Sequence, residues 1–332
     1  MTAFAHTPVL LDESLNYLAS RNDNDLFVDA NTGEGGHSFA FLSKFPHLKM
    51  VCIDADGSIL DIAKNRLEAF KDRVYFYNGW SFDFFTEYPS ELKRPDIILF
   101  DLGVSAYHYK VSGRGFSFEK DEPLDMRINS DSDLTAAALV ARLPEKELAD
   151  LIYNNSGERY SRRIASLIVK ERQKSAITTT KALADLINRA VPASYSQGGG
   201  APKGQSRQRR HGTINPATRT FQALRIAVNG ELSKLHALLE AAFRVLEPGG
   251  RLGVISFHSL EDKIVKNFFR EMNKNCICPP EAPICRCSGR RSVNVLTKKG
   301  ITPAKEEIER NPPSRSARLR AVEKILDGDD ND

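Results

Sequence analysis

Short apolar runs alternate with segments of helical spacing along residues 25–103, and this alternation constrains the fold more than any other feature. The apolar runs lie at 25–30, 48–56, 73–79 and 95–103, with helical segments between them at 37–45 and 57–71. Strand, turn, helix and strand in succession form the unit that builds a parallel sheet. We therefore predict an α/β protein with a doubly wound sheet.

The strand pattern stops after residue 105 and returns near residue 214. Helical segments are expected at 133–141, 144–154, 161–174 and 179–191, before a stretch at 193–212 that is rich in Gly, Ser, Gln and basic residues. Because that stretch lacks apolar periodicity, it predicts a flexible basic loop. Helices follow within 217–246 and at 259–273, and strands at 251–257, 292–297 and 316–325. We therefore predict a sheet domain formed by residues 1–105 and 214–332, interrupted by a helical insertion at 106–213.

Charge and hydropathy place the chain in a broad class. The net charge is +4, from 47 basic and 43 acidic residues, which decides little as a total. The basic excess is local, at 203–212 and 286–320, and fits a polyanionic partner such as nucleic acid as well as a solvated surface. No run of about 18 apolar residues is present, and the N-terminus lacks the pattern of a secretory signal. We expect a cytoplasmic protein with no membrane partner; a homodimer stays open.

A glycine-rich turn follows the first predicted strand, in 29-DANTGEGGHS-38. Ligands of a parallel α/β sheet bind at the carboxyl ends of its strands, where this turn lies. Gly33, Gly35 and Gly36 would let the backbone take positive φ and approach a ligand closely. Asp54 ends the second strand 18 residues after Gly36, near the spacing at which an acid meets a ribose hydroxyl. The alternative is that Asp54 caps the following helix.

Asp29 decides which cofactor this turn favours. A carboxylate beside the glycines would repel the pyrophosphate of a nicotinamide dinucleotide, which argues against an oxidoreductase. It would attract a cationic sulfonium with an amino-acid tail, so we expect S-adenosylmethionine. Asp101 ends the fourth strand, beside the reactive part of such a cofactor, and Trp80 after the third strand is placed to stack on the adenine. The alternatives are that both acids are local caps and that Trp80 is a core residue.

Motifs along almost the whole chain resemble one family. They are HTPVLLDE (6–13), TGEGGHS (32–38), DLGVS (101–105), RGFSF (114–118), PLDMR (123–127), PATRTFQALRIAVNGEL (216–232), PGGRLGVISFHSLED (248–262) and SRSARLR (314–320). In this order they resemble the bacterial 16S ribosomal RNA cytosine-N4 methyltransferases. The resemblance implies a Rossmann-like class I methyltransferase domain with an inserted helical substrate-recognition domain. It also implies S-adenosylmethionine-dependent methylation of the N4 amine of a cytidine at the decoding centre of the small ribosomal subunit.

The resemblance assigns cofactor contacts by position. These are Gly35, Gly36, His37, Asp54, Asp101 and His108, with an aromatic near Trp80, and Gly33 of the same turn is expected to join them. His108 stands where the family commonly has Gln, and Trp80 where it usually has Phe. Asn215 replaces the usual His, Glu122 replaces Gly, and SGER at 156–159 replaces GEER. The last three departures affect the substrate side and leave the cofactor side intact.

Methyl transfer to cytosine N4 requires mainly that the reacting groups be held in the correct geometry. The amine, the methyl carbon and the sulfur must be nearly in line, and acceptors for the amine protons would localise the nitrogen lone pair. Asp101 and the carbonyls of Leu102 and Gly103 fall at that place, so Asp101 is expected to serve the cofactor, the amine or both. The reaction needs no cysteine addition, so Cys52 is expected to be a buried strand residue. His258 is either a proton acceptor or a hydrogen-bonded structural residue.

Residues that would contact RNA are expected in the other family blocks. A cytidine must leave its stack to reach the pocket, at a cost of about a few kcal/mol. Arg114 and Phe116 offer a charge and a stacking face, and Arg219 and Arg225 offer guanidinium groups for phosphates. For each of these residues, packing in the core or on the surface is the alternative.

Four of the five cysteines cluster, at Cys276, Cys278, Cys285 and Cys287. Four thiolates can bind zinc tetrahedrally, and a reducing cytoplasm favours metal over disulfides. The spacing is not that of the common C-x-x-C knuckles, however, and no function of the family requires a metal. A loop without metal is the alternative.

The main alternative to an enzyme is a non-catalytic RNA-binding factor of ribosome assembly that retains the methyltransferase fold. The glycine turn and the acids at the strand ends argue against it. A cofactor-binding titration would separate the two.

Overall fold

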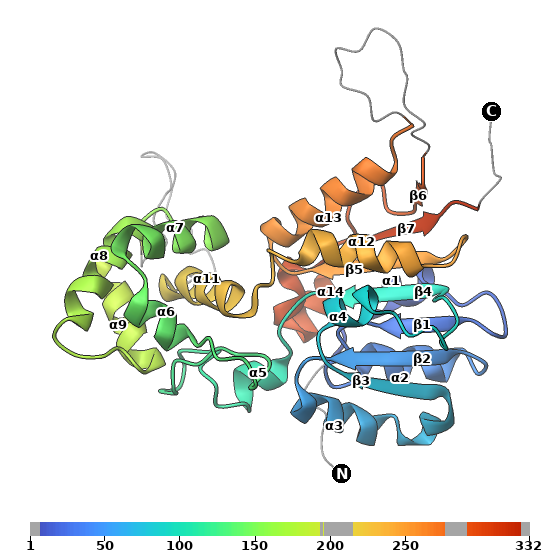
Figure 1. The fold of residues 1–332 in the computed structure, drawn as a ribbon, viewed down its shortest axis with the longest axis horizontal. Helices are drawn as coiled ribbons and strands as arrows, with labels where there is room; N and C mark the ends of the chain where they lie inside the picture. Colours follow the sequence, from blue (N-terminus) through green and yellow to red (C-terminus); the bar gives the residue numbers. More distant parts are fainter. Residues whose placement is uncertain (1–6, 193–194, 196–214, 276–290, 327–332) are drawn as a thin grey trace, which may run out of the picture. The chain divides into compact units, whose positions relative to one another are not determined.

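The computed structural model describes residues 7–192, 195, 215–275 and 291–326. The chain divides into two compact units, one formed by residues 1–105 with 232–332 and the other by residues 106–231. Figure 1 shows a sheet flanked by helices in the first unit and a cluster of helices in the second. Among the described residues, none of the helices combines the length and the apolar character needed to cross a membrane.

The first unit is built on a seven-stranded sheet with the order β3-β2-β1-β4-β5-β7-β6. Its strands are β1 (Leu26–Asp29), β2 (Lys49–Asp54), β3 (Val74–Asn78), β4 (Ile97–Asp101), β5 (Arg251–Ser256), β6 (Val293–Val295) and β7 (Arg318–Lys324). The strands β1 to β5 run parallel, and β7 is antiparallel to β5 and β6. The strand order reverses between β1 and β4, which is the switch point at which open α/β sheets bind ligands. The predicted Rossmann-like, doubly wound sheet is confirmed.

Helices cover both faces of this sheet, so its central strands are apolar except at their ends. The helices are α1 (Leu11–Tyr17), α2 (Gly36–Lys44), α3 (Gly57–Arg66), α4 (Ser81–Thr86), α12 (Leu235–Val245), α13 (Ser259–Met272) and α14 (Lys305–Arg310), with 3₁₀ turns at Glu68–Arg73 and Pro312–Ser316. One core packs residues of α4, α12 and α13 against the sheet, and a second core packs α2 and the N-terminal residues against the other face. All four residues of β1 are buried, as expected for a strand between two cores.

The second unit is helical. Its helices are α5 (Ala106–Lys110), α6 (Ala136–Arg142), α7 (Glu145–Ser156), α8 (Ser161–Arg172), α9 (Thr180–Ala190) and α11 (Ala217–Asn229). They share one apolar core, drawn mainly from α6 to α9 and α11. The four helices predicted between 133 and 191 are present, with ends that differ by a few residues.

The boundary between the units differs from the predicted one. The sequence places the return to the sheet domain at residue 214, whereas the helical unit continues to Glu231. The reason is α11, whose apolar face of Phe221, Leu224 and Val228 is part of the helical unit's core. The segment predicted as one or two helices is two, because α11 ends at Gly230, which has φ +62° and caps the helix in the left-handed conformation.

Candidate active site

Three acids share the carboxyl edge of the sheet at its switch point. Asp29, Asp54 and Asp101 are the last residues of β1, β2 and β4, and these strands are neighbours in the order β2-β1-β4. The loop from β1 to α2 lies at the same edge and contains the predicted glycines. The structure thus brings together the acids and the glycine turn that the sequence places at one site.

The glycines of the loop have different roles. Gly33 and Gly35 have φ of +53° and +75°, which glycine adopts without strain. A Cβ added to Gly33 would lie 3.9 Å from Ser105 Cβ, the nearest atom beyond its chain neighbours, whereas one on Gly35 would lie 3.3 Å from Ala63 Cβ. A Cβ on Gly36 would lie only 2.6 Å from Pro8 Cγ. Gly35 and Gly36 therefore allow close packing inside the protein, and Gly33 borders more open space.

Asp54 organises this loop. Its Oδ2 accepts a hydrogen bond from the amide of Gly33 at 2.8 Å, and its Oδ1 accepts one from the amide of Asp56 at 2.9 Å. The cap of α3 is Asp56, which accepts from the amide of Ser58 at 3.1 Å. The alternative that Asp54 caps this helix is therefore wrong, because the neighbouring aspartate does so.

Asp29 is a buried acid that binds a residue in the first turn of α2. It is 1% exposed, and its carboxylate accepts hydrogen bonds from Ser38 Oγ at 2.5 Å and from the backbone of Asn31. Burial raises the pKa of Asp29 to about 6, and the charge of Asp54 acts in the same direction, while these hydrogen bonds oppose them. These contacts match the alternative that Asp29 is a local cap on the glycine turn. Its charge also acts on the site, because it contributes to the raised pKa of Asp101.

Asp101 carries an unmatched acceptor. Its side chain is 14% exposed, and among the described residues its buried Oδ1 has no hydrogen-bond partner. Oδ2 lies 3.5 Å from Nδ1 of His37. Burial raises the pKa of Asp101 to about 8, with further contributions from the charges of Asp29 and Glu261. A buried carboxyl with a free acceptor at a ligand-binding edge is the strongest chemical feature of the unit.

The N-terminal segment 7–10 closes over the first turn of α2. His37 Nε2 donates a hydrogen bond to the carbonyl of Val9 at 3.0 Å, which orients the imidazole beside Asp101. From its other side, the segment is held by α14, where Glu307 Oε1 accepts from the amide of Leu10 at 2.8 Å. His37 is therefore fixed by protein contacts and is 5% exposed.

Two further predicted cofactor residues lie in different surroundings. Trp80 is half-buried between β3 and α4, at the residue before that helix. His108 belongs to the helical unit, where it is 4% exposed and its ring lies 5.0 Å from that of Phe116. Their contacts with a cofactor stay predictions.

Arg114 and Phe116 are used inside the helical unit. The guanidinium of Arg114 donates to the carbonyls of Arg127 at 3.1 Å and Ile128 at 2.7 Å. Phe116 is 5% exposed and packs against the ring of Tyr109 as well as that of His108. These contacts match the packing alternative for both residues.

The two arginines of α11 differ in exposure. Arg225 is 12% exposed and forms a two-pronged ion pair with Glu231, at 3.0 and 2.8 Å, and a hydrogen bond to Tyr109. Arg219 is 47% exposed and donates to the hydroxyl of Tyr195 at 3.1 Å. Arg219 remains on the surface, whereas the charge of Arg225 is matched within the unit.

His258 is a helix cap. Its Nδ1 accepts from the amide of Glu261 at 3.4 Å, its Nε2 lies 3.1 Å from Glu261 Oε1, and Glu261 Oε2 accepts from the amide of Phe257 at 2.8 Å. This capping box at the start of α13 supports the structural alternative. Cys52 is fully buried in β2, as predicted, and burial raises the pKa of its thiol. Cys276, Cys278, Cys285 and Cys287 lie outside the described residues.

Sequence comparison adds the family. The sequence matches the MraW methylase family over residues 3–325. This chain belongs to the MraW methylase family. A relative from Treponema denticola, named ribosomal RNA small subunit methyltransferase H, is 55% identical over 96% of this chain and 97% of its own length. A relative of the same name from Caldicellulosiruptor saccharolyticus is 45% identical over 97% of this chain and all of its own. An rRNA methylase structure from Streptococcus thermophilus aligns with 98% of the chain at 12% identity and a TM-score of 0.40.

The chain is therefore a methyltransferase, and its methyl donor is S-adenosylmethionine. The residues at the carboxyl edge fit the donor's two positive charges. Asp101 offers a buried oxygen without a partner among the described residues. Burial raises the pKa values of Asp29 and Asp101, with the charge of Asp54 adding at Asp29 and those of Asp29 and Glu261 adding at Asp101, and a bound cation would favour both ionised carboxylates. The donor's carboxylate must find amides beyond Gly33 and Gly35, because these bind Asp54 and Thr32. The first turn of α2 supplies such amides.

Sequence reasoning missed two residues of this edge. Asn31 has a buried Oδ1 without a hydrogen-bond partner among the described residues, in the turn directly after Asp29. Ser38 binds the Asp29 carboxylate, so that a helix residue stabilises a buried acid. The available signal was their position: both flank the glycines within 29-DANTGEGGHS-38.

Proposed function

We propose that this methyltransferase transfers a methyl group from S-adenosylmethionine to the exocyclic N4 amine of one cytidine in 16S ribosomal RNA, at the decoding centre of the small subunit. The relatives named ribosomal RNA small subunit methyltransferase H support ribosomal RNA as the substrate, because the identity of 55% extends over 96% of the chain. The choice of N4 follows the family resemblance of the motif blocks. The helical unit, residues 106–231, is proposed to recognise the RNA.

The observation that carries the chemistry is the unmatched Oδ1 of Asp101. The lone pair of cytosine N4 is delocalised into the ring, so an acceptor for an amine proton makes the nitrogen a better nucleophile. When bound, S-adenosylmethionine supplies an electrophilic methyl group. Asp101 accepts an amine proton in a hydrogen bond, orients the nitrogen toward the methyl carbon and stabilises the positive charge that develops on the amine. After transfer the proton is lost without a strong base.

The backbone after Asp101 shapes the space for the base. A Cβ on Gly103 would lie 2.9 Å from the ring of Phe257, so a glycine is required for that ring to approach the chain. We assign Phe257 as the aromatic wall beside the Leu102 and Gly103 carbonyls, a surface on which a cytosine can stack. The proposed stacking face and proton acceptor stand at the carboxyl ends of two paired strands, since Phe257 directly follows β5 and Asp101 ends β4.

Mass mapping of small-subunit RNA tests the function. In cells lacking the protein we expect one cytidine to lose a methyl group, and nucleoside standards distinguish N4-methylcytidine from the ring-methylated isomer. The unmodified gene should restore the methyl group and Asp101→Asn should not. Asp61→Asn, at a carboxylate whose side chain is 71% exposed on α3, is the matched control. An unchanged methylation pattern in the deletion would refute the function.

A purified-protein measurement separates the remaining alternatives. A non-catalytic assembly factor would not bind the methyl donor, whereas the proposed enzyme binds it and turns over. Asp101→Asn with normal donor affinity and normal turnover would eliminate a catalytic role for Asp101. Zinc is not expected, and less than stoichiometric zinc after purification without chelator would exclude a site at Cys276, Cys278, Cys285 and Cys287.

A further inference from the structure

A hollow in the helical unit combines arginines with exposed aromatic rings. It lies where α7 turns into α8 and has a volume of about 270 Å³. The residues that line it include Asp150, Tyr153, Arg159, Tyr160, Arg162 and Arg163. All of them belong to α7, α8 or the turn between these helices, so the surface is local to one unit.

The charge of this hollow is positive. Arg159, Arg162 and Arg163 are exposed, and the one carboxylate in its lining, Asp150, lies 3.7 Å from Arg162. The neighbouring acid, Glu158, is fully buried and does not face the solvent. Two of the three guanidinium charges therefore remain without a carboxylate partner in the lining of the hollow.

Aromatic rings hold the arginines in place. The guanidinium of Arg159 lies 4.9 Å from the ring centre of Tyr160 and 4.7 Å from that of Tyr195, and that of Arg163 lies 5.9 Å from Tyr160. Such stacking orients the planar group while leaving its N–H donors available. The ring of Tyr153 is 57% exposed beside them.

A buried carboxylate fixes this arrangement. Glu158 accepts hydrogen bonds from the hydroxyl of Tyr195 at 2.7 Å and the amide of Tyr160 at 2.8 Å. Arg219 lies 3.9 Å from Glu158 and offsets its charge. Because the two tyrosines that hold Arg159 are both bound to one carboxylate, the arginine is pre-organised for a ligand.

We propose that Tyr153, Arg159, Arg162 and Arg163 form a binding surface for single-stranded RNA. The arginines contact phosphates, and a base stacks on the exposed ring of Tyr153. A stacking face beside fixed guanidinium groups favours RNA over an acidic peptide, which would use the charges alone. The inference rests on the proposed function and deepens it by naming a surface of the helical unit that contacts the substrate RNA.

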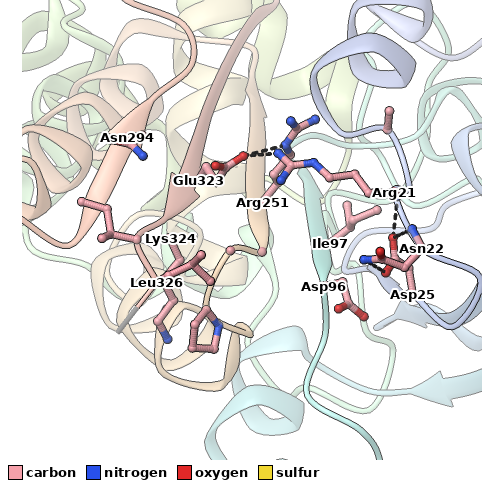
Figure 2. Close-up of a pocket in the computed structure, with 15 residues that line it drawn as sticks. Arg21, Asn22, Asp25, Asp96, Ile97, Arg251, Asn294, Glu323, Lys324 and Leu326 are labelled. Atoms are coloured by element: carbon pink, nitrogen blue, oxygen red, sulfur yellow. Dashed lines mark hydrogen bonds and ion pairs between the residues drawn. The ribbon is translucent and has the colours of Figure 1, made fainter. Parts of the chain in front are cut away.

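A second hollow, at the amino ends of β1, β4 and β5, shows the contrast. Figure 2 shows that its arginines, Arg21 and Arg251, both point to Glu323. Its two other acids are also satisfied, Asp25 by the amide of Arg21 and Asp96 by the amide of Leu26. With three acids and three bases in its lining, this hollow has no charge left to attract an ion and carries no proposal.

RNA binding of purified variants tests the surface. Anisotropy of a fluorescent single-stranded RNA that contains the target cytidine is measured against salt for the unmodified chain and for Arg162→Ala/Arg163→Ala. We expect the slope of log affinity against log salt to become shallower by about 1.4, which is 0.7 for each lost phosphate contact. Tyr153→Ala should weaken binding by about 5- to 150-fold, and Tyr153→Phe should not. Asp150→Asn should tighten binding.

The control is Lys181→Ala/Arg189→Ala, which removes two exposed charges from α9 of the same unit, outside the hollow. Its affinity and salt slope should equal those of the unmodified chain. Restoration of the slope by Arg162→Lys/Arg163→Lys, with an unchanged melting temperature, shows that charge and not folding is responsible. Equal slopes for the alanine double variant and the unmodified chain would overturn the inference. If the unmodified chain binds RNA in this manner but does not methylate it, the proposed function fails and the surface stands.

Discussion

The raised pKa of Asp101 should make the affinity for S-adenosylmethionine depend on pH. Burial, followed by the charges of Asp29 and Glu261, raises this pKa to about 8, and His37 Nδ1 lies 3.5 Å from the carboxylate. The donor brings a sulfonium and an ammonium, which favour the ionised carboxylate. Binding should therefore lower the pKa of Asp101 and release its proton.

The magnitude follows from the pKa. At pH 7 a carboxyl with a pKa of about 8 is roughly nine-tenths protonated, so binding should release about 0.9 proton. Affinity should rise about tenfold from pH 6 to pH 7, which equals about 1.4 kcal/mol, and level off above pH 8. Calorimetric titration in two buffers of different ionisation enthalpy, repeated from pH 6 to pH 9, measures both quantities.

Two variants make this measurement specific. Asp101→Asn cannot ionise, so it should lose the proton release at pH 7 and the rise in affinity up to pH 8. Asp61→Asn, whose side chain is 71% exposed, should retain both. An affinity that does not change between pH 6 and pH 8 in the unmodified chain, or a slope that persists in Asp101→Asn, would show that the carboxylate does not face the donor.

Three further predictions concern stability. Gly115 and Gly113 have φ of +73° and +66°, but an added Cβ meets the carbonyl oxygen of Pro123 only at Gly115. Thermal unfolding should therefore show that Gly115→Ala lowers stability by about 1–3 kcal/mol more than Gly113→Ala does. Glu158→Ala leaves a tyrosine hydroxyl and a buried amide without their acceptor, and denaturant titration should show a loss of about 1–3 kcal/mol, whereas a loss below 0.5 would contradict the network. The folded-state pKa of Asp101 lies above its unfolded value, so the folded chain binds the extra proton between about pH 4 and pH 8 and stability falls as pH rises through that window. Melting curves should therefore show Asp101→Asn gaining stability over the unmodified chain as pH rises from 4 to 8, and an equal difference at both pH values would contradict the raised pKa.

The centre of the sheet could be predicted from the sequence because β1, β2, β4 and β5 contain continuous apolar runs, and glycine and acidic residues lie at their ends. The seven strands lie within the predicted ranges, since burial between two cores imposes that pattern whatever the details of the packing. The boundary of the helical unit could not be predicted in the same way. The apolar stripe of α11 indicates that one face is buried, but not whether Phe221 packs in the sheet domain or in the helical core.

The position of the site at the carboxyl edge of the sheet could be predicted in the same way. The partners of individual side chains could not. Asp54 and Asp101 were expected at neighbouring strand ends because parallel strands end at one edge. Arg114 was expected to offer a charge to RNA and Arg225 to bind a phosphate, with packing as the alternative for each. In the structure Arg114 binds carbonyls and Arg225 binds a carboxylate of their own unit. An arginine carries the same charge whether its partner is a phosphate or Glu231, so residue type alone does not distinguish the two.

The hydrogen bond between the N-terminal segment 7–10 and α14 has a consequence for the order in which contacts form during synthesis. The carbonyl of Val9 accepts from His37, and the next residue, Leu10, is bound by Glu307, which follows it by almost three hundred positions. During synthesis, the first strands and the glycine loop are made long before Glu307, so they precede its hydrogen bond to Leu10. The last of these contacts around the imidazole beside Asp101 can therefore form only after residue 307 has been synthesised, so a chain terminated before this residue would lack one of the bonds that hold the N-terminal segment.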